Sequence, residues 1–390
     1  MKKIISLTLL AFMVFGLLAG CGTPTKPYEK PEPKTTLADP FTMDVSEPET
    51  LYTKEQRDEK ALFWWPDGSM GVTKNGGSYS FYAANSKNNA KTTGTLDDPA
   101  KTVDYAGGKL ENLMGDYDYL AGGPVFTHQG VLYMIYHFER HHDNDAMRFY
   151  SGLGLAYSND QGKTFTDLGT IMQPNIDFDH PGGHGIVEVC GGAYIIDGGY
   201  IYVYFRDRLN DGAYLIVDGY FTKIAGEGSE DIALSVMRAS LEDIATAQAN
   251  GTTPMFIKYY DGEFSQPGVS GLSSNILGEI GSVRWFDFLY DKSLNEYVMI
   301  YAQNTTSTAV NLFLARSADK INWSIPMQMT HETDECFYPT AISTGDDPKI
   351  SDGSFYVFYT QAMPSANRWT FASVKRIEVK IAESGPIVKL

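Results

Sequence analysis

Cysteine and cationic side chains are scarce in this sequence. Only three of its 390 residues are cysteine, at Cys21, Cys190 and Cys336. A disulfide between Cys190 and Cys336, or two separate buried thiols, are both compatible with this count. Lys and Arg number 31 against 48 Asp and Glu, a formal net charge of −17. Such a chain repels phosphates, which argues against nucleic acid or an anionic membrane surface as a partner and favours neutral or cationic ligands.

Two common enzyme motifs are absent as well. There is no G-x-S-x-G elbow, which leaves a nucleophilic Ser or Cys arrangement without support. The Gly-Gly pairs precede strands rather than open helices, so the sequence has no phosphate-binding glycine loop. The run His137–Asp145 holds three histidines and several carboxylates, but its spacing fits no strong zinc pattern. We expect a solvated loop there rather than a metal site.

Long apolar runs are missing except at the N-terminus. Ile4–Leu18 follows two lysines and is too short for a transmembrane helix, so it predicts a secretory signal. It ends in Leu-Ala-Gly before Cys21, which resembles a bacterial lipobox. The resemblance implies a lipoprotein signal peptide over residues 1–20, with lipid on Cys21. An ordinary signal peptide with a chance cysteine is the alternative.

The following residues, 21–40, are rich in Pro, Lys and Thr and cannot bury a core. We expect a lipid-anchored flexible linker there, and one domain over residues 41–390. The expected location is the bacterial cell envelope, with an extracytoplasmic domain tethered to the membrane through the lipid on Cys21.

The rest of the chain repeats a strand–turn–strand pattern. Gly122–Arg140 and Gly191–Arg208 align with each other, with glycine at the bend and β-branched and aromatic residues on both sides. Weaker copies lie at Trp285–Asn304, Tyr338–Gln361 and Asp67–Ala84. Five such hairpins predict an all-β fold, a five-bladed β-propeller.

The blade boundaries follow from the hairpins. We expect short helices at Ser240–Ala249, where a Ser precedes Glu and Asp, and around Lys54–Leu62 in the weakly patterned residues 41–62. The strand Phe371–Ile381 should pair with the first or the fifth blade. The five blades are expected at 63–117, 118–180, 181–276, 277–332 and 333–390.

Two turns carry a recognisable motif. Ser158–Phe165 fits S-x-D-x-G-x-T-F and resembles the Asp-box of sialidases and other glycan-active propellers, and Ser317–Trp323 is a degenerate copy. The Asp side chain should cap the backbone amides of the turn, the Gly should take the strained dihedral, and the aromatic residue should pack beneath. The motif indicates fold and is not catalytic.

In a propeller, residues just before each hairpin and just after its second strand converge at one mouth of the central channel. In this chain those positions are rich in carboxylates, with Arg, His and Trp among them. Glycoside cleavage needs one carboxylic acid, one carboxylate as base or nucleophile, and aromatic rings against the sugar. The catalytic candidates are Asp67, Asp118 and Glu188, and the substrate-binding candidates are Trp64, Trp65, His184, Arg206, Asp207, Arg284, Trp285 and Glu335.

The five blades, the Pro-Asp-Gly segment and the acidic channel resemble glycoside hydrolases of families 43, 32, 68 and 117. Trp64–Gly68 resembles the W-x-N-D-P-N-G opening of family 32, without its Asn and its Pro order. This implies Asp67 as nucleophile, or as base if the enzyme works like family 43. Val187–Cys190 resembles the family 32 E-C-P segment, which implies Glu188 as general acid, although Cys190 stands one residue too far along.

A third segment, Phe205–Arg208, resembles the F-R-D-P segment that carries a stabilising Asp. It lacks the Pro and follows Glu188 instead of preceding it. We therefore prefer Asp118 as third carboxylate and keep Asp207 in reserve. A calcium ion in the central channel, as in some of these families, could use His184; otherwise we expect no metal and no cofactor.

Each catalytic candidate has a structural alternative. Asp67 stands in Pro-Asp-Gly, a common turn. Glu188 lies in an apolar run, where it could form an ion pair with Arg206 or Arg284. Asp118 could be a solvated loop residue, and the tryptophans could be core residues.

The sequence therefore predicts a carbohydrate-active envelope lipoprotein that hydrolyses an oligo- or polysaccharide. In this interpretation Glu188 is the acid, Asp67 the base or nucleophile, and Asp118 tunes the acid. One alternative is a non-catalytic glycan-binding or scaffolding propeller that lacks a matched acid pair. Another is a sialidase-like enzyme with an arginine triad and a sixth blade hidden in the long third unit.

Overall fold

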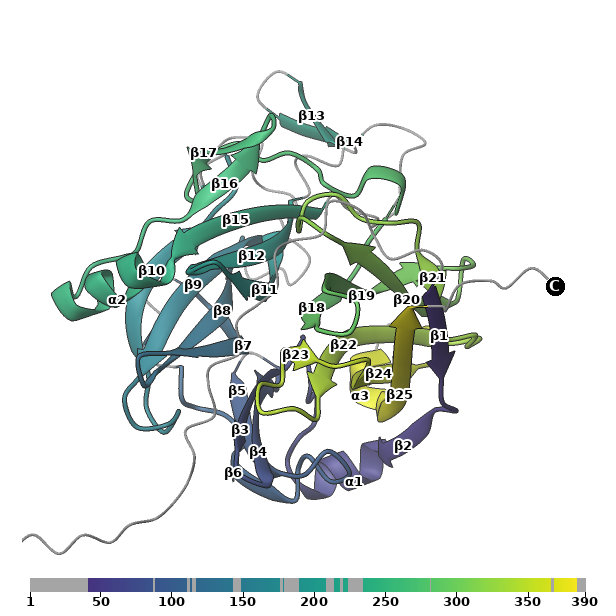
Figure 1. Cartoon of the computed structure of the whole chain (residues 1–390). Helices are drawn as coiled ribbons and strands as arrows, with labels where there is room; N and C mark the ends of the chain where they lie inside the picture. The colour runs from purple at the N-terminus through teal and green to yellow at the C-terminus, as the bar shows by residue number, and fades with distance from the viewer. Residues whose placement is uncertain are drawn as a thin grey trace, which may run out of the picture. The chain divides into compact units, whose positions relative to one another are not determined.

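The computed structural model describes residues 41–383 except for 87, 111–112, 114–116, 143–148, 176–177, 179–188, 208–213, 218–219, 224–233, 281 and 366–367. Within these ranges the chain is almost entirely strand and turn (Figure 1). The helices are short: α1 (Lys54–Glu59), α2 (Leu241–Asn250), α3 (Arg368–Phe371) and a 3₁₀ turn at Gly278–Ile280. None of the helices described is long and apolar enough to span a membrane.

The first three large sheets follow one another along the chain, each built from neighbouring antiparallel strands. The first sheet holds β3 (Gly71–Asn75), β4 (Ser78–Ala84), β5 (Asn89–Gly94) and β6 (Thr102–Tyr105). The second holds β7 (Tyr119–His128), β8 (Val131–His141), β9 (Phe149–Ser158) and β10 (Thr166–Met172). The third holds β11 (Val189–Asp197), β12 (Tyr200–Asp207), β15 (Leu234–Ser240), β16 (Ile257–Tyr260) and β17 (Glu263–Pro267).

The remaining strands form a ten-stranded sheet and a two-stranded ribbon of β13 (Tyr214–Val217) and β14 (Tyr220–Lys223). One part of the large sheet holds β18 (Phe286–Asp291), β19 (Glu296–Asn304), β20 (Val310–Ser317) and β21 (Met327–Gln328). The other part holds β22 (Glu335–Ser343), β23 (Ile350–Ser351), β24 (Ser354–Ala362), β25 (Ser373–Glu383), β1 (Phe41–Val45) and β2 (Glu49–Tyr52). Between β20 and β22 the only paired residues are Val310 and Glu335.

All five predicted hairpins are present, as β3–β4, β7–β8, β11–β12, β18–β19 and β22–β24. The β7–β8 turn shows why glycine marks the bend. Gln129 and Gly130 both have positive φ, 49° and 80°, the conformation of the tight turns that match the twist of paired strands. The helix predicted at Ser240–Ala249 is also confirmed, because Ser240 caps α2 by accepting a hydrogen bond from the Asp243 N–H.

The first strand of three hairpins is interrupted at an equivalent point. The pairing register shifts between Gly122 and Val125 in β7, between Gly191 and Tyr194 in β11, and between Phe337 and Thr340 in β22. Such a bulge bends the strand and redirects a side chain. In β7 and β11 the bulge begins at a Gly-Gly pair, and the residues left out of the pairing are Gly123 and Pro124 in β7 and Gly192 and Ala193 in β11.

Hydrophobic cores lie between successive sheets, and the last part of the chain packs on the first. Ile342, Phe358 and Val374 share one buried cluster with Trp65 and Phe81. The strand predicted at Phe371–Ile381 is β25, which pairs with β24 as one of the two expected partners.

The weakly patterned residues 41–62 hold more structure than the sequence predicted. Besides the expected helix α1 they contain β1 and β2, both paired with β25. Arg376 of β25 forms an ion pair with Glu49 of β2 at 2.5 Å and a second one with Asp97, in the loop between β5 and β6, at 2.7 Å. The partners lie more than 270 positions apart in the chain, so no local pattern could reveal the pairing.

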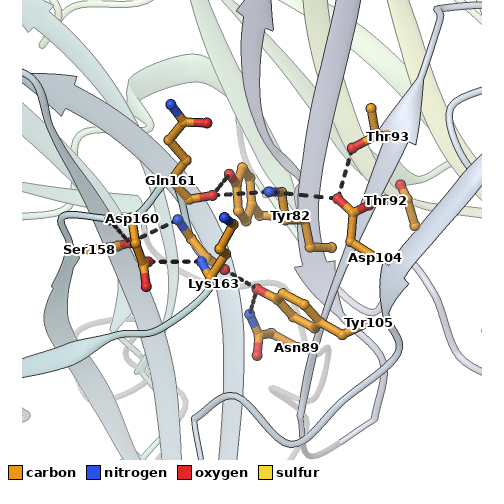
Figure 2. A network of polar contacts seen from close by, with 12 residues as sticks. Tyr82, Asn89, Thr92, Thr93, Asp104, Tyr105, Ser158, Asp160, Gln161 and Lys163 are labelled. Carbon is orange, nitrogen blue, oxygen red and sulfur yellow. Dashed lines mark hydrogen bonds and ion pairs between the residues drawn. The ribbon is translucent and has the colours of Figure 1, made fainter.

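Both Asp-box turns form as expected and contact the preceding sheet, and Figure 2 shows the first of them. Asp160 accepts hydrogen bonds from the backbone N–H of Lys163 and Thr164 at 3.0 and 2.9 Å. The Tyr82 hydroxyl on β4 donates to the Gln161 carbonyl at 3.0 Å. In the same way, the Tyr204 hydroxyl on β12 donates to the Lys320 carbonyl of the second Asp-box at 3.0 Å. The two turns therefore perform the same structural role in two different sheets.

The sequence left open whether Cys190 and Cys336 form a disulfide and whether the third unit hides a sixth blade. Cys190 and Cys336 are not joined by a disulfide, and Cys336 is buried in the core. Burial raises the pKa of the Cys336 thiol far above its ordinary value, so this cysteine is a core residue. The described residues of the third unit form one five-stranded sheet and the β13–β14 ribbon, not a further four-stranded sheet.

Candidate active site

Asp67 lies in the loop that leads into β3, and three elements converge on it. Its backbone N–H donates to the Ala84 carbonyl at 3.0 Å, which fixes the loop against the end of β4. The Tyr119 hydroxyl of β7 donates to Oδ2 of Asp67 at 3.4 Å, and the hydroxyl of Tyr338 on β22 is a second donor.

Burial is the main reason why the pKa of Asp67 is raised to about 6. The negative charge of Glu139 acts in the same direction, while the two tyrosine donors and His137 lower the value. A carboxyl group with a pKa near 6 can hold or release a proton close to neutral pH. This property suits a general base or acid.

Tyr338 reaches Asp67 from a strained backbone conformation. It lies in the β22 bulge with φ of 56°, in the left-handed region that bulky side chains rarely adopt. At the equivalent bulge of β11, Gly191 and Gly192 have positive φ without this cost. Such strain persists where surrounding contacts enforce it, and it is concentrated at functional sites. Tyr338 is therefore a site residue that sequence reasoning missed. A positive φ at a residue other than glycine cannot be predicted from the residue type.

A row of polar side chains runs along one face of β8 beside Asp67. His137, Glu139 and His141 alternate along the strand, so all three point to the same face. His137 Nε2 lies 3.0 Å from Oε1 of Glu139, and His141 Nε2 lies 3.3 Å from Oε2 of the same residue. The sequence-based expectation of a solvated loop is therefore wrong for residues 137–141, which belong to a partly buried strand.

Asp118 stands at the outer end of this row. Its carboxylate lies 2.6 Å from Nδ1 of His141 and accepts the His141 backbone N–H at 3.0 Å. Its own N–H donates to the Glu139 carbonyl at 3.1 Å. The Asp118 side chain is 48% exposed, so the row extends from solvent towards Asp67.

A second polar group centres on Glu335, at the start of β22. Glu335 is buried and accepts two hydrogen bonds from Nη1 of Arg368, at 3.1 and 2.9 Å. Nη1 of Arg284 lies 3.7 Å from the same carboxylate, and the Arg284 carbonyl accepts a hydrogen bond from Arg206 at 2.6 Å. Three of the predicted binding residues, Arg206, Arg284 and Glu335, are thus brought together. The sequence did not identify Arg368.

Trp285 connects this group with Asp67. Its ring packs edge-on against Tyr338 at 5.1 Å between centroids, and the Arg284 guanidinium lies 5.0 Å from it. Because Tyr338 also binds Asp67, one continuous set of contacts runs from the carboxyl group to the arginines. Trp285 is half-buried in this position.

Asp207 lies apart from these contacts. It is buried and accepts a hydrogen bond from Ser273 at 3.0 Å. Its charge also opposes the effect of burial on Lys258, whose pKa falls to about 8 chiefly because the ammonium is desolvated. Lys258 in turn donates to the Gln173 and Gly271 carbonyls, both at 2.7 Å. The geometry of Asp207 therefore supports a structural function in the third sheet.

The two predicted tryptophans beside Asp67 differ in exposure. Trp64 is 37% exposed, and its backbone N–H donates to the Asn85 side chain at 3.0 Å. Trp65 is 0% exposed and packs edge-on against Tyr52 inside the core. Its carbonyl accepts a hydrogen bond from the buried Arg57 at 3.2 Å. A ring enclosed in this way offers no face to a sugar, so Trp65 belongs to the core and not to the binding residues.

Three predicted residues, Cys21, His184 and Glu188, lie outside the described residues. Among the residues that are described, no group of three or more His, Cys, Asp or Glu side chains is arranged to hold a metal ion. The β8 row is held by hydrogen bonds from His137 to Glu139 and from His141 to Asp118, and by an ion-pair contact between His141 and Glu139.

No protein-family model matches the chain, and no curated protein matches it in sequence. Among solved structures it is similar to a family 117 glycoside hydrolase of the marine bacterium Zobellia galactanivorans, with a TM-score of 0.52 and 10% identity over 87% of this chain and 90% of that one. It also aligns with a GH62 α-L-arabinofuranosidase of Coprinopsis cinerea, with a TM-score of 0.47 and 10% identity over 80% and 90% of the two chains. A thermostable family-43 glycoside hydrolase aligns with a TM-score of 0.47 and 13% identity over 82% and 93%. The first likeness confirms in fold the resemblance to propeller glycoside hydrolases that the motifs implied.

Proposed function

We propose that this chain is a glycoside hydrolase built on a five-bladed β-propeller. The ten-stranded sheet supplies two of the blades, because its two parts are joined by short parallel contacts, Val310 with Glu335 and β18 with β23, and each part begins with its own hairpin. With the three separate sheets this gives five blades, and the contact of Phe358 and Val374 with Phe81 joins the fifth to the first.

Asp67 carries the functional proposal. It is held by donors from two other blades, and its pKa near 6 matches a group that must exchange a proton near neutral pH. In the proposed reaction Asp67 is the base that activates water, or the nucleophile that attacks the sugar. Glu188 donates the proton to the leaving oxygen, and Asp118 tunes that acid.

The proposed substrate is an oligo- or polysaccharide. The half-buried Trp285 and the partly exposed Trp64 provide ring surface beside Asp67, which suits stacking against sugar faces. The net charge of −17 also favours a neutral glycan over a polyanion.

The proposed location of the protein is the bacterial cell envelope. The lipobox-like residues before Cys21 and the Pro-rich linker support a lipoprotein of the bacterial cell envelope, with its propeller outside the cytoplasm. Cleavage before Cys21 and lipid attachment would be tested by labelling with a radioactive fatty acid in wild type and in Cys21→Ser. Label in both proteins would refute the lipid site.

Hydrolysis itself is tested by a screen of the purified chain against aryl glycosides and plant and algal polysaccharides. Release of reducing sugar supports the hydrolase. Retention of a polysaccharide in a pull-down, without any release across the panel, would instead identify a glycan-binding propeller.

A further inference from the structure

Glu139 is not among the catalytic residues that the sequence suggested, and it has an unusual environment. Both of its carboxylate oxygens face an imidazole: Oε1 lies 3.0 Å from His137 and Oε2 lies 3.3 Å from His141. All three side chains are 17% exposed, so solvent screens these contacts only in part. The strand period places them in one row without any loop between them, which gives the row a rigid support.

His141 joins a second carboxylate to the row. Its Nδ1 lies 2.6 Å from Asp118 and its Nε2 lies 3.3 Å from Glu139. The arrangement from Asp118 through His141 and Glu139 to His137 therefore alternates carboxylate and imidazole from the solvent inwards.

The inner end of the row meets Asp67. The His137 ring lies edge-on to Tyr119, with 6.1 Å between ring centroids, and the Tyr119 hydroxyl donates to Asp67. The charges of Glu139 and His137 both act on Asp67, with opposite signs. Two titratable groups on other elements also face this site. Arg57 of α1 interacts electrostatically with Asp67, and Tyr338 of β22 interacts electrostatically with Cys190 of β11.

We propose that Glu139, held between His137 and His141, is a positioning residue that sets the charge of Asp67, and that Asp118 anchors this row at the solvent end. The inference rests on the proposed function of Asp67 as base or nucleophile. Two neighbouring carboxylates disfavour simultaneous ionisation, so a fixed Glu139 keeps Asp67 ready to take a proton at a higher pH than an isolated aspartate would. Loss of the Glu139 charge would make Asp67 a weaker base.

The activity test compares Glu139→Gln with Glu263→Gln, a matched change at an exposed position of β17. The acidic limb of the kcat/KM profile reports ionisation of Asp67 in the free enzyme. We expect Glu139→Gln to move this limb to lower pH by about 1 unit. Asp118→Asn should move it in the same direction by less, because it releases His141 and loosens Glu139. The proposal would be overturned if the acidic limbs of Glu139→Gln and Asp118→Asn coincided with that of Glu263→Gln.

A second test needs no substrate. Thermal unfolding of the full chain is followed for Asp67→Asn, Glu139→Gln and the double variant, at about pH 4 and about pH 8. We expect the two changes to be additive at the lower pH, where Asp67 is protonated, and coupled at the higher pH, where two charges repel. Additivity at both values would refute the charge-setting function of Glu139. If the coupling appears but no glycan is hydrolysed, the inference stands and the proposed function fails.

Discussion

The Tyr119 hydroxyl donates a hydrogen bond to Oδ2 of Asp67 across 3.4 Å, joining the second sheet to the loop that leads into the first. Asp118, the residue before Tyr119, binds His141 at the outer end of the β8 row. Two consecutive residues thus contact the inner carboxyl group and the outer end of one polar network.

Asp67→Asn should make the protein more stable at neutral and alkaline pH. Its carboxyl group has a pKa of about 6 in the fold, above the value of about 4 in an unfolded chain. Because the pKa of Asp67 is higher in the folded than in the unfolded chain, protonated Asp67 contributes its full stability below about pH 4. This stability is lost as the pH rises to about 6. We expect a gain of roughly 2–3 kcal/mol in the free energy of unfolding at about pH 8 and none near pH 4.

This prediction is checked by urea denaturation at several pH values, with Asp104→Asn as the control. Asp104 is an exposed carboxylate on β6 that contacts Thr93 and Lys91. If the wild type is as stable as Asp67→Asn at about pH 8, or more stable, ionised Asp67 does not destabilise the fold and the prediction is wrong.

Tyr119→Phe and Tyr338→Phe should each raise the pKa of Asp67. Both hydroxyls donate to the ionised carboxylate and so favour it. The acidic limb of kcat/KM should then move to higher pH in each variant, opposite to the shift expected for Glu139→Gln. Tyr105→Phe also loses a hydroxyl, the one that donates to Gly162 at 3.0 Å, and should leave the limb in place.

Arg368→Gln should destabilise the fold without shifting that limb. The change removes both hydrogen bonds to Glu335 and leaves this buried carboxylate with Arg284 at 3.7 Å. Breaking a buried ion pair from one side costs roughly 3 kcal/mol. Arg368→Lys keeps the charge and should cost less. Equal stability of Gln, Lys and wild type in urea denaturation would contradict the importance of this ion pair.

Asp160→Ala should cost about 1–2 kcal/mol of stability and leave kcat unchanged, because the Asp-box Asp caps a turn in the manner of a helix N-cap residue. Hydrogen bonds, first that from the Thr164 backbone, lower the pKa of Asp160 to about 2. Its contribution is therefore present above about pH 4 and is lost as the pH falls towards 2. Asp319→Ala provides a second test in the other Asp-box. Loss of activity at unchanged stability would mean that the box contacts substrate.

Much of the fold could be predicted from sequence because its signals are local. Alternating apolar residues, with glycine at the bend in every case except β18–β19, identify the five hairpins, and Asp160 and Asp319 identify the capped turns. The pairing of β1 and β2 with β25 could not be found this way, since the partners are separated by most of the chain. Sequence spacing alone can show neither which strands meet nor in what order they pack.

The site was predictable to a lesser degree. Asp67 could be identified from its Pro-Asp-Gly turn before the first hairpin, whereas Tyr338 required its φ of 56° to be known. Glu139 had a usable signal, since His137, Glu139 and His141 alternate at the period of a strand. That signal was missed because a group of His and acidic residues at the end of an apolar run was interpreted as a loop. Trp65 shows the opposite error, because a Trp beside a candidate carboxylate can equally well fill the core.

The account as a whole depends on the hydrolysis of a glycan through Asp67. The decisive measurement is kcat of wild type, Asp67→Asn and Asp104→Asn on the best substrate of the polysaccharide screen. We predict a fall of about 10²–10⁴-fold for Asp67→Asn, with Asp104→Asn equal to wild type. Sugar release that persists at the wild-type rate in Asp67→Asn would contradict the account, because the reaction would then take place without the carboxylate around which the site is built.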